Sequence, residues 1–414
     1  MKKYFDYLYY LTGLPFIFLT IATSRNFTLI KIVLLSTIFF VSICEVFFIN
    51  NGKLVRFLFK YILIFVSYFM ISLCIGIVSG YPFDFINDFS LIQYFFITPI
   101  FILIISEIFY LNSYRTDIFE KILKYVTLIV LILDLNKILS FILPIPDFDF
   151  FNLIMVSSSN MYSNELTLRV SNEVNLMFLL PFFIVQLFEG ENNKKDELLY
   201  ILIFLLGALY AVLSGRKVLE IVIVGALVFE LYRLFNKKWK TIIKVSILIL
   251  LFFPIILFLL KYIENLIGLN NIFEQAYLTI KEGFSNSSRG VVVRKNYFNS
   301  LIDLWLNSII MGNGLNSHAA VLASNTTLWS YEIVYVALLA QTGLIGVSIF
   351  FYGVIYIVYK LYRLYKKNNK KIYLSCLVAF ISFIFCGSSN PLVYIIWPWI
   401  FIIANLYREK QRGV

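Results

Sequence analysis

Apolar side chains follow one another in long runs along most of the chain, and short polar segments separate the runs. Most of the runs are close to the ~20 residues that an α-helix needs to cross a bilayer. We therefore predict twelve membrane-spanning helices, at residues 4–23, 28–49, 57–79, 91–110, 122–145, 174–189, 198–214, 218–236, 241–262, 331–359, 372–388 and 391–407. The expected fold is all-α, with residues 1–414 forming one polytopic helical bundle.

The longest interruption is segment 263–330, between the ninth and tenth expected helices. Inside it, residues 272–284 and 291–310 carry apolar side chains at helical spacing. The apolar residues of the second stretch that fall near one face are Val293, Tyr297, Leu301 and Leu304. We expect two amphipathic helices here, lying on the membrane surface or capping the bundle.

The charge pattern orients the chain. There are 35 Lys and Arg residues against 24 Asp and Glu residues, an excess that in a soluble protein would suggest nucleic acid as a partner. Here most cations fall in short loops between apolar runs, where they act as topology signals. With the N-terminus inside, most of them are cytoplasmic, as is the C-terminus, and segment 263–330 lies outside. The charge pattern thus indicates a multi-pass membrane protein with no nucleic acid partner.

Metal and cofactor chemistry has no signature in the chain. The four cysteines lie in or at the end of apolar runs, without CxxC or Cys/His spacing, so we assign them neither a disulfide nor a metal. We expect no metal and no cofactor.

Positive charge on the outer face is the exception, and it gathers in two clusters, "LSGRK" (213–217) and "SSRGVVVRK" (287–295). Their cations are Arg216, Lys217, Arg289, Arg294 and Lys295. An arginine at a water-lined interface suits a diphosphate, because its planar donors bind phosphate oxygens two at a time. The alternative is contact with lipid headgroups or snorkelling of the side chain to the interface.

The local setting of each arginine decides what it can reach. Arg216 follows Gly215 in a short turn, where the backbone can approach a ligand closely. Arg289 and Arg294 are five residues apart, so on one helix they point roughly 140° apart. Both can approach one anion only if Arg289 caps the helix that contains Arg294.

Three further polar residues at the outer face are candidates for acid–base work or binding. His318 is the only histidine and follows "MGNGLNS". Its ordinary pKa suits a general base, although an exposed loop histidine is usually inert. Tyr331 and Glu332 open the tenth expected helix, where Glu332 either binds substrate or interacts with the helix N-terminus. Few charges lie within the apolar runs, which counts against a proton- or ion-driven transporter.

The order of four motifs resembles the O-antigen polymerase and ligase superfamily. "LRVSNEVNLMFLLPFFI" (168–184) resembles its Arg followed by Asn entering a helix, here Arg169 and Asn175. "LSGRK" (213–217) is similar to its "SGSR" turn, and 287–314 to its pattern of Arg, aromatic helix and GxG. "LLAQTGLIGV" (338–347) resembles the start of the next helix, so the resemblance covers roughly 165–350.

This resemblance implies a multi-helix glycosyltransferase fold of the GT-C kind and a Wzy-type polymerase of O-antigen or capsule. Such an enzyme joins undecaprenyl-diphosphate-linked oligosaccharides at the outer face of the bacterial cytoplasmic (inner) membrane. A chain-length regulator protein is a candidate partner. Arg216, with Arg289 or Arg294, would bind the lipid diphosphate. The candidate catalytic residues are Arg216, Arg294, Arg289, His318 and Glu332. The candidate substrate-binding residues are Lys217, Arg169, Asn175, Lys295 and Tyr331.

One departure separates the branches of the superfamily. The ligase branch typically has His-Asn about a dozen residues before the first Gly of the last motif, where this chain has Tyr331 and Glu332. The departure favours polymerase and leaves the general base open. The alternatives are an O-antigen ligase with the same donor, or a non-enzymatic flippase of lipid-linked oligosaccharides.

Overall fold

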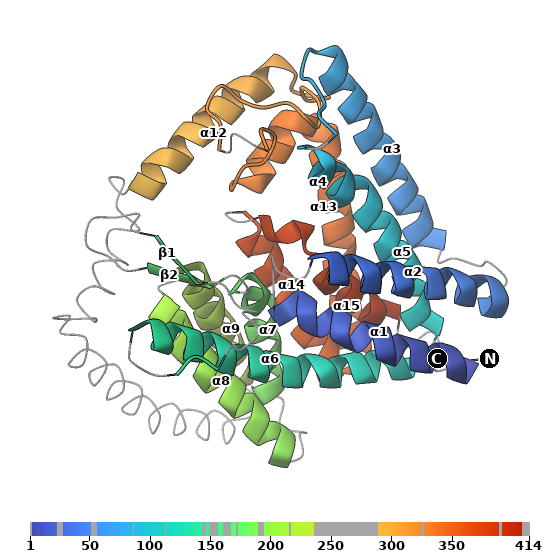
Figure 1. The fold of residues 1–414 in the computed structure, drawn as a ribbon, viewed down its shortest axis with the longest axis vertical. Helices are drawn as coiled ribbons and strands as arrows, with labels where there is room; N and C mark the ends of the chain where they lie inside the picture. The colour runs from blue at the N-terminus through green and yellow to red at the C-terminus, as the bar shows by residue number, and fades with distance from the viewer. Residues whose placement is uncertain are drawn as a thin grey trace.

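The computed structural model describes residues 2–22, 28–50, 56–85, 87–111, 113–142, 146–148, 156–159, 167–170, 173–188, 194–214, 217–235, 289–323, 327–388 and 391–407. In these ranges the chain is almost entirely helical (Figure 1). The helices are α1 (Lys2–Ala22), α2 (Thr28–Asn50), α3 (Arg56–Val78), α4 (Phe89–Ile92), α5 (Thr98–Leu111), α6 (Ser113–Ile142), α7 (Glu173–Phe188), α8 (Lys194–Ser214), α9 (Lys217–Phe235), α12 (Arg289–Asn307), α13 (Val334–Asn368), α14 (Lys371–Cys386) and α15 (Ile396–Tyr407). A π-helical turn, η1 (Gln93–Ile97), joins α4 to α5, and a 3-10 turn, η2 (Pro391–Tyr394), precedes α15.

Helix boundaries follow the predicted apolar runs closely at most ends, and depart from them most at two. Helix α6 begins at Ser113 rather than at residue 122, and α13 continues to Asn368 rather than ending at residue 359. Polar residues end an apolar run without ending a helix, because Lys, Arg and Glu are good helix formers. The expected helices at 241–262 and 272–284 lie outside the described residues.

Membrane-spanning character is supported for part of the predicted bundle. Among the described residues, four helices are long and apolar enough to cross a membrane, at 4–22, 58–78, 89–106 and 334–368. Shorter apolar helices cover 174–188, 371–386 and 396–407. These helices are consistent with a membrane protein, and a bundle of twelve spans is not confirmed.

A short hairpin departs from the all-α expectation. Strand β1 (Val156–Ser159) pairs antiparallel with β2 (Thr167–Val170), with Ser157 opposite Arg169. The β-branched residues of these segments favour extended backbone, and the runs are too short to start a helix. Arg169 therefore lies on a strand before α7 rather than in the helix itself.

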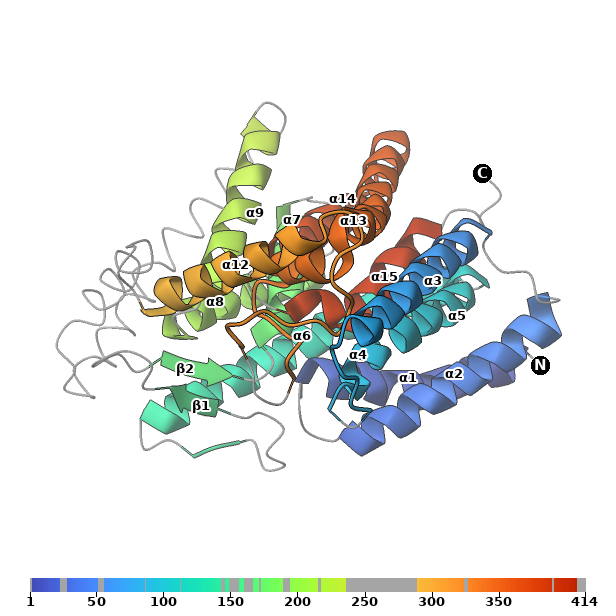
Figure 2. The ribbon, with the colours of Figure 1, turned by 90° about the horizontal axis from the view of Figure 1, so that it is seen from above.

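Helix α7 forms the centre of the largest core cluster and packs against α14, α9 and α8. Residues from Asn175 to Phe188 are buried on every side, as expected for a helix that is apolar all round, apart from Asn175 itself and Gln186. Around Phe178, the rings of Phe383, Trp397 and Phe401 from α14 and α15 meet edge to face. Helices α1 and α2 lie side by side at the edge of this core (Figures 1 and 2).

Helices α3 and α13 run antiparallel. The Tyr61 hydroxyl donates to the Ile349 carbonyl at 3.0 Å, and the Tyr68 hydroxyl donates to the Thr342 carbonyl at 2.6 Å. Residues of increasing number along α3 therefore contact residues of decreasing number along α13. The end of α3 and the beginning of α13 share one end of the molecule, where α12 also lies (Figure 1). The loop after α3 and the segment before α13 therefore lie at the same end of the molecule, where the Asn316 amide donates to the Tyr81 carbonyl.

A glycine junction joins α13 to the segment that follows α12. Gly343 has φ 63° and ψ −168°, which interrupts the helical backbone inside α13. At this interruption, the amides of Leu344 and Ile345 donate to the carbonyls of Ile309 and Ile310, at 3.1 and 3.2 Å. A Cβ at Gly343 would lie 2.2 Å from the Ile310 oxygen, so only glycine fits.

Candidate functional site

Helix α12 lies against the beginning of α13 through a small apolar cluster. Leu301 and Leu304 are buried there with Ala337, Ala340 and Tyr331, and Tyr297 packs at its edge. Three of the four residues expected on the apolar face of this helix thus face the bundle. Val293 is instead 36% exposed, near the beginning of α12. The packing carries the polar beginning of α12 over the beginning of α13.

Arg294 and Glu332 meet at this place. The Nε and Nη2 atoms of Arg294 both donate to Oε2 of Glu332, at 3.2 and 3.1 Å. The two side chains are 48% and 51% exposed, so the pair stands in solvent and adds little to stability. Within the described part of the chain, the Nη1 atom of Arg294 has no hydrogen bond to the protein. An anion can therefore approach the guanidinium without entering the core.

Tyr331 lies beneath the pair and is almost fully buried. Its hydroxyl oxygen accepts a hydrogen bond of 2.8 Å from the Ala319 amide, and its ring meets Tyr297 edge to face. Burial raises the pKa of Tyr331 above its ordinary value, and the Ala319 hydrogen bond offsets only part of that change. The phenol therefore stays protonated and keeps its O–H as a donor.

His318 precedes Ala319 and is half-buried. Its ring lies edge to face with Tyr81, with 5.3 Å between the ring centroids. Tyr81 belongs to the loop after α3, which the fold brings to the same end as the beginning of α13. We call Arg294, His318, Tyr331 and Glu332, with Tyr81 and Tyr297 around them, the cap site. The sequence did not indicate Tyr81, because nothing local marks a residue 237 positions before His318 as its neighbour.

Hydrogen bonds to backbone carbonyls hold the loop beneath the cap site. The Gln341 amide donates to the carbonyls of Ser317 and Trp329, at 3.1 and 2.7 Å, and the Asn316 amide donates to the Tyr81 carbonyl at 2.6 Å. These donors are buried, so their bonds are protected from competing water. The cap site therefore rests on a preorganised support.

The loop after α3 also contains a carboxyl that the sequence did not single out. Asp88 is buried, and its Oδ2 accepts a hydrogen bond of 3.0 Å from the Asp84 amide. Burial raises the pKa of Asp88 above its ordinary value; the Asp84 amide lowers it, and the charge of Asp84 adds to the rise. A buried carboxyl with a raised pKa is a candidate for proton transfer. We therefore add Asp88 to the candidate residues at this end of the molecule.

The other predicted site residues do not join the cap site in the described structure. Asn175 is buried in the core: its amide donates to the Ile21 carbonyl at 3.0 Å and accepts from the Trp397 indole at 2.8 Å. Lys295 is exposed on α12 beside Arg294. Arg289 is the first residue of α12, Lys217 the first of α9, and Arg169 lies on β2. Arg216 lies outside the described residues.

The position of Arg289 bears on an alternative left open above. Since α12 begins at Arg289 and includes Arg294, the first arginine starts the helix that contains the second. Both arginines are thus helical residues of α12 and point roughly 140° apart around its axis, so they do not both face one anion. Within the part of the chain that the structure describes, no three His, Cys, Asp or Glu residues lie together where they could hold a metal ion.

Comparisons of the chain with models of known protein families and with curated proteins find no match.

Two introduced cysteines test the orientation of the chain, in a Cys74→Ala background because Cys74 is an exposed natural cysteine. Ala320, near the cap site, and Lys367, at the end of α13, are both exposed. We expect Ala320→Cys to react with an impermeant thiol reagent in spheroplasts, and Lys367→Cys to react only after the membrane is permeabilised. The reverse pattern would overturn the orientation.

Proposed function

We propose that this chain is a polysaccharide polymerase, a metal-independent glycosyltransferase of the O-antigen polymerase kind. It joins undecaprenyl-diphosphate-linked oligosaccharide units at the outer face of the bacterial cytoplasmic membrane, with both termini in the cytoplasm. The observation that carries the proposal is the half-exposed Arg294–Glu332 pair, held on a rigid support at the end of apolar helices. A guanidinium in this place suits the diphosphate of a membrane lipid.

The reaction needs no nucleotide sugar, because the donor bond is already activated by the diphosphate. A hydroxyl of the incoming unit attacks the anomeric carbon of the growing chain and forms the new C–O bond. The bond from that carbon to the diphosphate oxygen breaks, and the lipid diphosphate leaves with the electron pair. Arg294, together with Arg216 by resemblance, stabilises the charge that develops on this leaving group.

The ion pair couples donor binding to base function. A diphosphate that binds Arg294 competes with Glu332 for the same guanidinium donors. Binding therefore frees the carboxylate of Glu332, which can take the proton of the attacking hydroxyl. His318 is the second candidate for this proton. Tyr331 is almost fully buried and supports the site through the hydrogen bond that its hydroxyl accepts from the Ala319 amide.

The glycan of a strain that lacks this gene tests the proposal. We expect single repeat units to replace the ladder of long polymers on a gel, and the wild-type gene to restore the ladder. Long chains that remain unattached to their acceptor would instead indicate an O-antigen ligase. Loss of all outer repeat units would indicate a flippase, and an unchanged ladder would contradict the proposal.

A further inference from the structure

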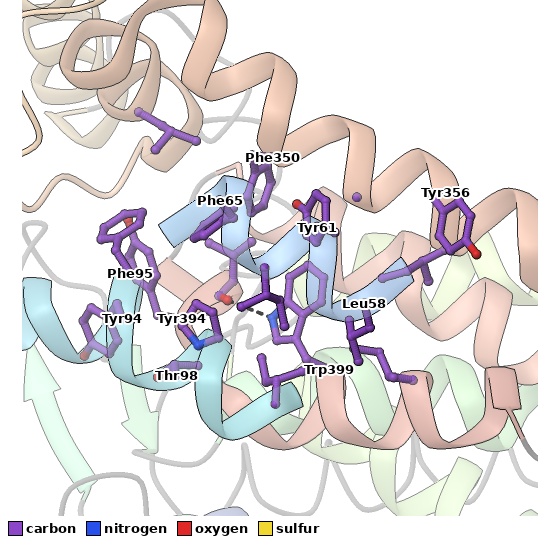
Figure 3. A pocket seen from close by; sticks show the side chains of 18 of the residues that line it. Leu58, Tyr61, Phe65, Tyr94, Phe95, Thr98, Phe350, Tyr356, Tyr394 and Trp399 are labelled. Carbon is purple, nitrogen blue, oxygen red and sulfur yellow. Dashed lines mark hydrogen bonds between the residues drawn. The ribbon is translucent and has the colours of Figure 1, made fainter. Parts of the chain in front are cut away.

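A crevice lies between α3, α5, α13 and α15, with a cavity volume of about 120 Å³ (Figure 3). Aromatic and aliphatic side chains from all four helices line it, among them Tyr61 and Phe65 of α3, Phe350 of α13 and Trp399 of α15. The lining includes no charged residue. All four helices contribute to the apolar spans and shorter apolar helices described above.

Three polar groups of the lining are hydrogen-bonded to the protein itself. The Tyr61 hydroxyl donates to the Ile349 carbonyl at 3.0 Å, and the Tyr335 hydroxyl donates to the Ile384 carbonyl at 2.6 Å. The Trp399 indole donates to the Val393 carbonyl at 2.9 Å, the bond drawn in Figure 3. The crevice therefore presents mainly ring faces and aliphatic groups, which suits a hydrocarbon ligand.

The lining is long in one direction. Along η2 and α15 it extends from Val393 to Tyr407, which corresponds to roughly 20 Å of helix. The hydrocarbon core of a bilayer is about 30 Å thick, so the lining is of the same order of length as that thickness. A ligand that fills such a space is a chain rather than a compact molecule.

One end of the crevice adjoins the cap site. Val334 and Tyr335 line the crevice and follow Glu332 in the chain at the beginning of α13. The opposite end is lined by Leu58, near the beginning of α3. A single lipid can thus place an anionic head at Arg294 and extend its chain between the helices.

We propose that this crevice holds the isoprenoid chain of the lipid-linked substrate while its diphosphate lies at the cap site. The inference rests on the proposed function, because that function supplies the polyprenyl carrier. Chain binding on the inside of the protein fixes the position of the diphosphate relative to Glu332. It also lets a carrier enter from the bilayer without leaving the hydrocarbon.

Photo-crosslinking in cells tests the occupant. Thr98 of α5 lines the crevice, whereas Ile100 of the same helix is 41% exposed and is not part of the lining. A small diazirine amino acid at position 98 is expected to give polyprenyl adducts, identified by mass spectrometry, at least tenfold more often than the same group at position 100. Phospholipid adducts at position 98, equal yields at the two positions, or no lipid adduct at position 98 would overturn the inference.

Filling the crevice separates this inference from the proposed function. We expect Thr98→Trp to lower polymer yield at least tenfold at normal protein abundance, and Ile100→Trp to leave it unchanged. If Thr98→Trp lowers abundance, the crosslinking result decides alone. If deletion of the gene leaves the ladder unchanged but polyprenyl adducts form at position 98, the proposed polymerase function is refuted and binding of the isoprenoid chain in the crevice is supported. If the ladder depends on the gene but only phospholipid adducts form at position 98, binding of the isoprenoid chain in the crevice is refuted and the polymerase function is supported.

Discussion

Replacing Arg294 with alanine is expected to slow polymer formation by about one to two orders of magnitude. The guanidinium makes a charge-assisted contact worth about 1.5–3 kcal/mol, which counts fully if it is made to the departing diphosphate in the transition state. The Arg294–Glu332 pair is half-exposed, so its loss should leave protein abundance unchanged. The measurement is the glycan ladder of a complemented deletion strain, with the variant quantified through an epitope tag.

Arg294→Lys shows whether the planar guanidinium or merely the positive charge of Arg294 is needed, and a second variant on the same helix is its control. Arg294→Lys should recover little activity, because a point charge cannot replace two aligned donors. Asp303→Ala changes an exposed charge on the same helix, away from the ion pair, and should leave the ladder intact. A normal ladder for Arg294→Ala at normal abundance would contradict binding of the diphosphate at the cap site.

Gly343→Ala is expected to prevent accumulation of folded protein. The backbone at Gly343 lies in a region that other residues rarely adopt, and occupying it costs about 1–3 kcal/mol. The added Cβ would also lie 2.2 Å from the Ile310 oxygen and 2.5 Å from the Gly312 nitrogen. Both are backbone atoms in the junction that holds the cap site, so neither can move without breaking its hydrogen bonds. Abundance and melting temperature of detergent-purified protein measure the loss.

Gly225→Ala is the matched control for that change. Gly225 lies inside α9, and an added Cβ would meet nothing within 4 Å. Alanine is favoured over glycine in a helix by about 1 kcal/mol, so this variant should be at least as stable as the wild type. Equal melting temperatures for the two variants would show that the junction is not the rigid element that we describe.

Local pattern was enough to find most helices. The runs at 28–49 and 57–79 became α2 and α3 with ends within a residue or so of the prediction, and 291–310 became α12. Such agreement is expected, because helical hydrogen bonds join residues four apart and apolar runs record burial in protein or lipid. The kink at Gly343 was not predicted, since a glycine in an apolar run has the same local signature whether it is straight helix or a junction.

The candidate site, like the helices, could be predicted from the sequence only in part. The sequence by itself determined which residues are chemically capable: an arginine cluster beginning at Arg289, a single histidine, and a carboxylate at the beginning of a helix. Only the tertiary structure decided that Arg294 meets Glu332, 38 residues away, that Tyr81 adjoins His318, and that Asn175 belongs to the core. The crevice beside Thr98 likewise exists only once four separate helices pack. Periodicity encodes contacts within one helix, whereas contacts between distant segments depend on how side-chain shapes fit together, which a one-dimensional pattern of apolar and polar positions does not record.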